Sequence, residues 1–464
     1  MDISLPRGPQ EKWGIMRHNV STKVHTNNLN ILNSLIFVCT ALTSTSSAAA
    51  DEAVSVRSSM SWYTYGSILQ PVEDSPANPD NTVLQLDNQT GGIDIRPDIR
   101  AMSGALKIIA RPQLKMQVSK AIVGGKDRPE RPKSSGRWIE SYGLLTASDK
   151  VQVSFGLQNY QWGAAESLNP SNRIFHENID GKGLLYTVEG RNIGRVNISW
   201  TKRINSVLMS ETEKAKDVSL FRAEETFQTK ALMKHEINWN NGADYVGVVY
   251  GAPETGDSWF GEYFNLSLLD GLSFYADAAH QKNSEAWYPV FEASPQAPNQ
   301  QVVQLRQSKI SDGKFYTLAV VGLRYSFEGG SDLRLEYISN DAGWSIEESQ
   351  RAVLALNLKS PLQVADYPKN LQRILKPGLE YRGKSFALIS WRIPDVFDVK
   401  DFVIYARTLR SVVDGSATYY GSTEYSFGSA STLIFSAYAT QGTTDSDLRG
   451  VASSVITAGI RQDF

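Results

Sequence analysis

The sequence predicts an all-β protein, a single transmembrane antiparallel up-and-down β-barrel with long external loops. Three observations favour it: strand-like stretches with one polar and one apolar face, an alternation of short and long connections, and a final segment with strand periodicity. After residue 50 no apolar stretch reaches the roughly 18 residues of a transmembrane helix. Since only helices and closed barrels satisfy every backbone polar group in lipid, the strands would have to cross.

The alternation is clearest in residues 93–101, 106–118 and 195–201, where apolar side chains occupy every second position and charged or polar ones lie between them. Such a period-two pattern is typical of a strand that separates two environments. A soluble sandwich and a barrel filled with water give the same pattern, so the two ends of the chain have to decide between them. Pro97 and Pro112 lie inside two of these stretches and predict a bulge or a local break, because proline removes a ladder donor.

Short turns rich in Gly, Asn and Asp are expected at 148–150, 240–243, 270–271, 328–331 and 428–430. Longer polar stretches are expected at 71–81, 122–136, 163–182, 205–228, 252–258, 282–313, 340–378, 411–415 and 441–449. Short periplasmic turns and long external loops characterise outer-membrane barrels, and this number of loops implies about 18 strands. The region near 82–92 has a weaker pattern, which is also compatible with about 16.

The expected strands follow from these connections. They cover 58–69, 83–101, 106–120, 137–147, 151–162, 184–190, 195–203, 230–239, 244–251, 259–269, 272–281, 314–327, 332–339, 379–393, 401–410, 416–427, 431–440 and 450–464. Within the long stretch 340–378, Ser345 followed by Glu348 matches a helical capping box. The expected helix either packs on the rim or forms a lid or plug over the pore.

The two ends of the chain support a barrel. Residues 1–50 are expected to be a secretory signal peptide, with basic residues before the apolar run 29–42 and small residues up to Ala50; Met16 could be the true start. Residues 51–464 would form the barrel. At the other end Ile456, Ile460 and Phe464 lie on one face of a strand that would close the sheet, which is the strand the barrel-assembly machinery would engage.

Composition excludes several kinds of site. The formal net charge is −2, which gives no support to nucleic-acid binding. The one cysteine, Cys39, falls in the expected signal peptide, so disulfides and thiolate metal sites are not expected. No His, Asp or Glu cluster has metal-ligand spacing, and no cofactor or catalytic residue is predicted. The basic stretch 126–137 is Pro-rich, and we expect it either to meet lipopolysaccharide phosphates or to be solvated.

The alternation places many cations on the face that would line the pore, because a Lys or Arg on the lipid side would cost about 2–4 kcal/mol near the midplane. The expected pore-lining residues are Arg96, Arg100, Lys107, Arg111, Lys115, Arg195, Arg203, Arg324, Arg334, Glu336, Arg382, Lys384, Arg392 and Arg407. A cationic wall favours the passage of anions. The alternative, that these cations pair with wall carboxylates and only stabilise the barrel, stays open.

A further segment carries a resemblance to known proteins. Trp162-Gly163 at a strand end followed by Asn169-Pro170, together with residues 332–337 and 340–344, resembles outer-membrane barrels of the alginate-export and porin-like type. The resemblance implies an 18-strand channel and an arginine-lined path for anionic solutes. It also implies an inward-folded loop that constricts the channel. The residues expected to form this constriction are Trp162, Glu166, Asn169, Pro170 and Arg173.

We therefore expect a porin-like channel in the bacterial outer membrane, not an enzyme, which passes small, anionic solutes by diffusion. Its partners would be outer-membrane lipid and lipopolysaccharide, the barrel-assembly machinery and the small solute. The alternative is a plugged barrel that serves as a surface-binding or structural protein. A third possibility, an outer-membrane hydrolase, has weaker support because the histidines after residue 50 are scattered.

Overall fold

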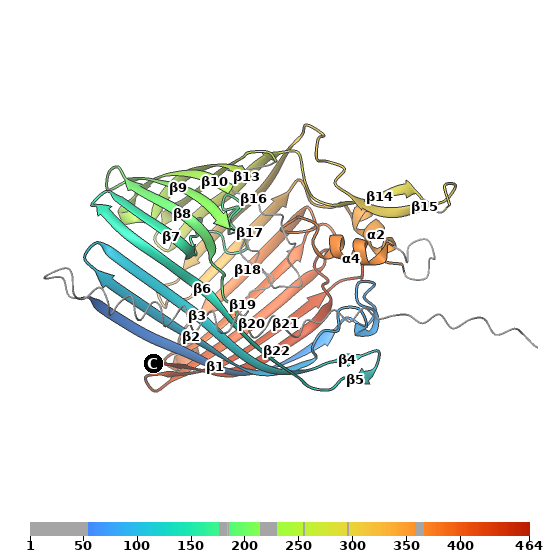
Figure 1. The fold of residues 1–464 in the computed structure, drawn as a ribbon, viewed down its shortest axis with the longest axis horizontal. Helices are drawn as coiled ribbons and strands as arrows, with labels where there is room; N and C mark the ends of the chain where they lie inside the picture. The colour runs from blue at the N-terminus through green and yellow to red at the C-terminus, as the bar shows by residue number, and fades with distance from the viewer. Residues whose placement is uncertain are drawn as a thin grey trace, which may run out of the picture. The chain divides into compact units, whose positions relative to one another are not determined.

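A computed structural model describes residues 54–175, 183, 185–213, 230–253, 256–294, 297–357 and 366–464. The expected signal peptide, residues 1–50, lies outside the described residues. Eighteen strands form one sheet (Figure 1). They are β1 (Ser55–Pro71), β2 (Gln89–Ser103), β3 (Leu106–Lys120), β6 (Arg131–Ser148), β7 (Val151–Gln158), β8 (Arg191–Ser199), β9 (Ile204–Glu213), β10 (Lys230–Trp239), β11 (Asp244–Pro253), β12 (Trp259–Leu269), β13 (Leu272–Lys282), β16 (Phe315–Ser326), β17 (Asp332–Asn340), β18 (Ser385–Ile393), β19 (Phe402–Ser411), β20 (Ala417–Phe427), β21 (Ser431–Gln441) and β22 (Ala452–Asp463).

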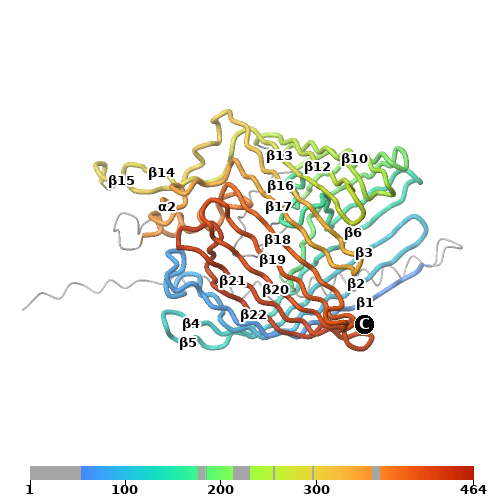
Figure 2. Tube along the Cα trace, turned by 180° about the vertical axis from the view of Figure 1, so that it is seen from behind, coloured from blue at the N-terminus to red at the C-terminus, as the bar shows by residue number. Residues whose placement is uncertain are grey.

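Every neighbouring pair in this sheet is antiparallel, and the last strand pairs with the first. In that closing ladder Ile456 lies opposite Ile68 and Ile460 opposite Thr64. The backbone of Phe464 extends the ladder, with its N–H 2.9 Å from the carbonyl oxygen of Met60. The sheet is thus a closed up-and-down barrel, and strands far apart in the sequence lie side by side at the seam (Figure 2). The predicted fold class and the count of 18 are confirmed.

The two faces of the wall differ as the alternation predicts, and β17 shows this most clearly. Leu335 and Tyr337 are 46% and 50% exposed on the outer face. Glu336 between them is 4% exposed and points inward. Because a closed barrel has no free edge, its backbone groups pair within the wall and its outer face can be wholly apolar.

The short and long connections also alternate as expected. All five expected short turns join consecutive strands at one end of the barrel, and the long connections lie at the other end. The smaller elements lie in the connections. They are β4 (Ile122–Val123), β5 (Lys126–Asp127), β14 (Tyr288–Ala293), β15 (Gln301–Arg306), α2 (Ile346–Leu354), α4 (Tyr367–Leu375) and three short 3-10 turns, η2 (Pro79–Asn81), η3 (Asn240–Gly242) and η4 (Val396–Asp398). No helix among the described residues is both long and apolar enough to span a bilayer.

The helix expected from the capping box is α2. The Ser345 side chain accepts a hydrogen bond from the Glu348 N–H, and the Glu348 carboxylate accepts one from the Ser345 N–H at 2.8 Å, so both orphan donors are satisfied. With α4 and the β14–β15 hairpin it encloses a small core that includes Tyr288, Leu305 and Trp344. These elements form a cap beside the long connections (Figure 1). Both alternatives expected from the sequence, a cap that packs on the rim and leaves the pore open and a lid that covers the pore, stay predictions.

Asp447 joins this cap to two further long connections. Its carboxylate accepts hydrogen bonds from Ser349 of α2 at 3.3 Å and from Ser411 at 3.2 Å. Burial and the nearby Asp414 raise the pKa of Asp447 to about 6. Burial would also raise the pKa of Asp414, but hydrogen bonds donated by Ser416 and by the Asp447 backbone outweigh it and hold that pKa below its usual value. The junction therefore holds two close carboxylates of unequal acidity.

One expected strand is wrong and one was missed. The described part of 184–190 forms no strand, and β9 occupies residues that were expected to belong to a loop. The reason is that the middle of β9 has apolar side chains on both faces: Val207 and Met209 are each 4% exposed on the inner face, while Leu208 is 45% exposed outside. Because apolar side chains occupy the inner face there, the alternation of polar and apolar residues that predicts a strand is lost.

The two prolines act as expected. The β2–β3 ladder runs from Gln89 to Ile95 and resumes at Ile99, so it is interrupted around Pro97 and Pro112. The β3–β6 ladder also shifts register between Arg111 and Pro112. The local break that the missing donors predict is confirmed.

Candidate functional site

The residues between β7 and β8 carry the candidate site. Residues 159–175, which we call the inner segment, leave the end of β7 and run along the inner face of the wall from β8 to β19. Leaving a strand for the interior requires compensation for every backbone N–H and C=O, since these groups no longer belong to a ladder. Two wall carboxylates accept hydrogen bonds from N–H groups of the inner segment, and apolar contacts and a side-chain network also hold the segment against the wall.

Two apolar clusters hold the inner segment against the wall. Trp162, Ile174 and Phe175 pack on inward-facing side chains of the middle strands, among them Val207, Met209, Leu232, Val249, Trp259 and Tyr263. Leu168, 2% exposed, packs on Val320, Ile338, Phe386, Leu388 and Leu409 of β16 to β19. Burying side chains of this size stabilises by about 1.5–3 kcal/mol each. The inner segment is therefore part of the core of the barrel.

Two wall carboxylates hold its backbone. Glu336 on β17 accepts hydrogen bonds from the N–H groups of Glu166 at 2.6 Å and Ser167 at 2.9 Å, and from the Tyr275 hydroxyl at 2.7 Å. Asp277 on β13 accepts from the Ser171 N–H at 2.6 Å and its hydroxyl at 2.9 Å. Both carboxylates are almost fully buried, with 4% and 1% exposure. A buried carboxylate that lost these donors would be strongly destabilising, so the segment and the wall depend on each other.

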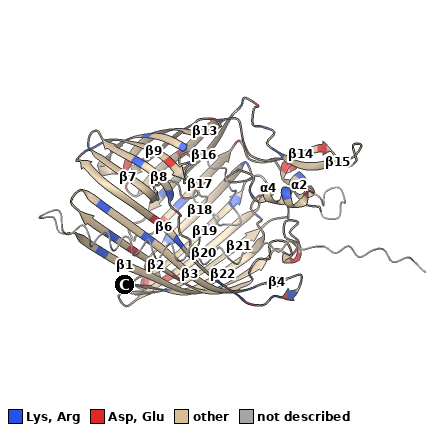
Figure 3. Cartoon of the chain, in the orientation of Figure 1, with Lys and Arg blue, Asp and Glu red and all other residues tan. Residues whose placement is uncertain are grey.

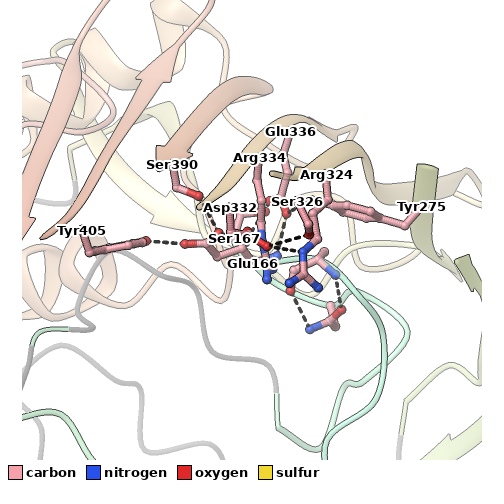
Figure 4. A network of polar contacts seen from close by, with 12 residues as sticks. Glu166, Ser167, Tyr275, Arg324, Ser326, Asp332, Arg334, Glu336, Ser390 and Tyr405 are labelled. Carbon is pink, nitrogen blue, oxygen red and sulfur yellow. Dashed lines mark hydrogen bonds and ion pairs between the residues drawn. The ribbon is translucent and has the colours of Figure 1, made fainter. Parts of the chain in front are cut away.

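The Glu166 side chain is the centre of a polar network (Figure 4). It accepts hydrogen bonds from the Tyr405 hydroxyl and, at 2.5 Å, from the Ser390 hydroxyl. The Arg334 Nε lies 3.5 Å from the Glu166 carboxylate and donates to Asp332 at 2.9 Å. Asp332 also pairs with Arg324. The network therefore contains two guanidinium groups and three carboxylates, those of Glu166, Asp332 and Glu336, and it has no excess of positive charge.

Gly163 is required by this geometry. Its φ is +90°, a backbone conformation that favours glycine. A Cβ atom there would lie 2.6 Å from Asp277 Oδ2 and closer still to Asn169 Oδ1. The turn that brings the inner segment onto Asp277 thus has no room for a side chain.

A cavity of about 470 Å³ remains between the inner segment and the wall. The segment contributes Gln161 and neighbouring residues, and β11 to β17 contribute Tyr245, Asn265, Ser273, Arg324 and Arg334. This volume lies within the range of about 300–1,000 Å³ that is typical of small-molecule sites.

Across the ring of strands, β2, β3 and β6 present an array of charges (Figure 3). Arg96 pairs with Asp94 at 2.7 Å, Arg100 and Arg111 share Asp98, and Arg111 also pairs with Glu140. These contacts form the kind of ion-pair ladder that the alternative interpretation expected.

Other predicted cations lie over aromatic rings instead. Lys115 is 5.5 Å from the ring centre of Tyr65, and Arg195 is 4.3 Å from that of Tyr160. Among the described residues, neither these two nor Lys107 has a carboxylate within ion-pair distance. The inner wall therefore carries both cations that are paired with carboxylates and cations that are not.

Several predicted wall residues lie elsewhere. Arg203 is in the turn between β8 and β9, where its carbonyl accepts from the Asn238 N–H. Arg382 and Lys384 precede β18, which begins at Ser385, and the Arg382 guanidinium binds the carbonyls of Ser446 and Asp447. The expected strand 379–393 began too early: β18 starts at Ser385, and before it Gly383 makes only an isolated parallel bridge with Trp344.

The remaining predicted wall cations are on strands. Arg392 lies on β18 opposite Tyr405 and is exposed near the end with short turns. Arg407 on β19 is 8% exposed, and its guanidinium lies 4.3 Å from the ring centre of Tyr420.

All five predicted constriction residues belong to the inner segment. Trp162 donates from its indole N–H to the Ser171 hydroxyl at 2.9 Å, and the Asn169 side chain accepts from the Ala165 N–H at 3.2 Å. Arg173 donates to Gln281 of β13. Pro170 lies between Ser167, which is bound by Glu336, and Ser171, which is bound by Asp277.

The residues that sequence reasoning missed are the partners of the inner segment, above all Asp277, Ser390 and Tyr405. They are 106 to 239 positions from their contacts in the sequence. No local sequence pattern shows that a carboxylate will bind the backbone of another segment. The one feature that could have indicated Asp277 is that it is an acidic residue at an inward-facing strand position. Within the described residues no group of three or more His, Cys, Asp or Glu side chains could hold a metal ion.

Comparison with known proteins gives matches of fold. No protein-family model and no curated protein matches the chain. OccAB1 of Acinetobacter baumannii superimposes with a TM-score of 0.52 at 11% identity, covering 88% of this chain and 96% of that one. OccK5 (OpdH) of Pseudomonas aeruginosa superimposes with a TM-score of 0.51 at 7% identity, covering 88% of this chain and 98% of that one. OccK11 (OpdR) of the same organism superimposes with a TM-score of 0.51 at 10% identity, covering 88% of this chain and 96% of that one.

These neighbours are outer-membrane porins of the Occ/OprD type, and they give the expected likeness to alginate-export barrels no support. The chain therefore has the 18-strand barrel fold of Occ/OprD-like porins.

Proposed function

We propose that the chain is an outer-membrane channel that passes small polar solutes by diffusion, with a preference for anions. The observation that carries the proposal is the wall itself: a mostly apolar outer face, an inner face that carries most of the charged side chains, and no free edge. The likeness to porins supports it. The inner segment narrows the interior from one side, so the solute path runs between this segment and the strands opposite.

The anion preference follows from cations that lack carboxylate partners. Lys107, Lys115 and Arg195 face inward without such a partner among the described residues, whereas both guanidinium groups near Glu166 are paired with carboxylates. A positive excess along a pore favours the entry of anions. Selectivity is thus assigned to these cations of β3 and β8 more than to Arg324 and Arg334.

The test is a reversal-potential measurement on the purified protein in planar bilayers under a KCl gradient. We expect ion currents with a reversal potential on the anion-selective side, and Lys115→Gln should move it toward cation selectivity. Lys309→Gln is the matched control, because Lys309 belongs to the external cap. Cation selectivity in the wild type would contradict the assignment, and a folded barrel without conductance would contradict the channel.

One observation favours a second candidate, a barrel used for surface binding. The cap has its own core, and Tyr367 of α4 donates to the Pro76 carbonyl of the β1–β2 connection at 3.0 Å. These contacts give the cap an ordered surface that a partner could bind. Replacing residues 286–306 with a short Gly-Ser linker separates the candidates. An unchanged conductance would favour the channel, and conductance that appears only after removal would favour a closed binding protein.

The remaining expectations are part of the proposal. Residues 1–50 would direct export and be removed, β22 would engage the barrel-assembly machinery, and the apolar outer face would meet lipid. The tip of the β3–β6 connection carries exposed Lys126, Arg128 and Arg131, which suit the phosphates of lipopolysaccharide. No catalytic role is proposed.

A further inference from the structure

The cavity between the inner segment and the wall differs from the cationic side of the barrel. Its lining contains two guanidinium groups, those of Arg324 and Arg334. Both pair with Asp332, and Arg334 also lies 3.5 Å from the carboxylate of Glu166. Both guanidinium groups are thus paired, and the Glu336 carboxylate, which accepts from the lining Tyr275 at 2.7 Å, adds a further negative charge, so the cavity has no positive excess. An anion placed there would compete with Asp332 and Glu166 for donors that are already used and would meet their repulsion.

The other groups of the lining are uncharged and have hydrogen-bonding capacity to spare. In the part of the chain that the structure describes, no protein group bonds to the Gln161 amide, the Tyr245 hydroxyl or the Ser273 hydroxyl. The Asn265 amide donates to the Ala243 carbonyl at 2.7 Å, which leaves its side-chain oxygen available. These groups can donate to and accept from several hydroxyls at once.

The cavity also has an aromatic wall. Tyr245 lines it with its ring held against Tyr263, with the two ring centres 5.9 Å apart and the planes tilted by 59°. Carbohydrates present a face of C–H groups that packs on aromatic rings, while their hydroxyls seek polar partners. A rigid ring beside unused hydroxyl and amide groups meets both requirements.

We infer that this cavity is a subsite for an uncharged, polyhydroxylated ring, a neutral monosaccharide. The inference rests on the proposed channel function and adds a solute class that the cationic wall does not select. Solutes would thus meet two unlike surfaces inside the barrel. The unpaired cations of β3 and β8 attract anions, and the cavity between the inner segment and the wall retains neutral sugars.

The first experiment compares glucose with glucuronate, which differ in whether C6 carries an alcohol or a carboxylate. Saturation-transfer NMR on the detergent-solubilised full-length protein reports binding whether or not the barrel conducts, and block of the bilayer current reports binding in the channel. We expect glucose to give the stronger transfer and the lower half-blocking concentration. Tighter binding of glucuronate by the wild type would overturn the inference. A protein that binds glucose and does not conduct would support the subsite and contradict the channel.

Variants make the test specific. Tyr245→Ala should raise the half-saturating glucose concentration about tenfold, which corresponds to about 1.4 kcal/mol. The matched control Tyr337→Ala, on the outer face, should leave glucose binding unchanged. Asp332→Asn releases charge on Arg324 and Arg334 and should shift preference toward glucuronate. Glucose binding that survives Tyr245→Ala, in a barrel whose heat-modifiable migration shows it to be folded, would overturn the assignment.

Discussion

Glu336 holds the inner segment through three hydrogen bonds, and Glu336→Gln removes part of that anchor with little change in shape. An amide has one acceptor oxygen, so it can retain the bonds to Glu166 N–H and the Tyr275 hydroxyl, which share one carboxylate oxygen. The Ser167 N–H, 2.9 Å from the other oxygen, would then face an NH₂ group. Losing one hydrogen bond to a charged acceptor costs about 1.5–3 kcal/mol.

Hydrogen–deuterium exchange of residues 163–169 measures this loss directly, because exchange reports the free energy of local opening. The cost corresponds to exchange about 10- to 150-fold faster in the variant. The matched control is Glu262→Gln, since Glu262 pairs with His280 at 3.1 Å on the outer face and does not touch the segment. Exchange within twofold of the wild type, in a folded Glu336→Gln barrel, would refute the anchoring role.

Three further outcomes are expected. Gly163→Ala places a Cβ against Asp277 Oδ2 and should detach the start of the inner segment, which would be seen as faster hydrogen–deuterium exchange there. Wild-type protection of the segment in this variant would contradict the steric limit at the turn. Asp447→Asn should raise Tm at pH 7.5, and the difference should shrink as pH falls through 6 and vanish only below the ordinary aspartate pKa of about 3.8. The reason is that burial and Asp414 raise the folded-state pKa of Asp447 to about 6, so the folded protein binds that proton more tightly than the unfolded chain and gains stability as pH falls through 6. A difference independent of pH would exclude this explanation. Arg324→Gln should shift the reversal potential toward cations, whereas Arg324→Gln combined with Asp332→Asn should restore it; equal effects of the two variants would show that the pair is not balanced.

The barrel could be predicted from the sequence because its signal is local. Alternation in β17 and in β2, the Gly- and Asn-rich turns, and the capping box at Ser345 each need only a few neighbouring residues. The same reasoning failed at β9, where Val207 and Met209 pack on apolar side chains of the inner segment and interrupt the polar inner face. The prediction also began the strand that corresponds to β18 too early, so that it included Arg382.

The site was harder to predict because it depends on distant pairs. Glu336 could be placed on the inner wall from alternation, but its bonds to the backbone of Glu166 and Ser167 join residues 170 and 169 positions apart. Likewise, a cation at position 334 could be expected to line the pore, but not that Asp332 and Glu166 would balance it. Net charge at a site depends on which side chains meet, and that is fixed by the fold.

The central claim is that the barrel is an open channel narrowed by a segment fixed to its inner wall. Single-channel conductance of the wild type and of a variant in which residues 163–172 are replaced by a short Gly-Ser linker tests it most directly. We expect discrete conductance steps for the wild type and larger steps for the variant. Folded barrels that give no steps in either form, or steps of the same size in both, would contradict the account.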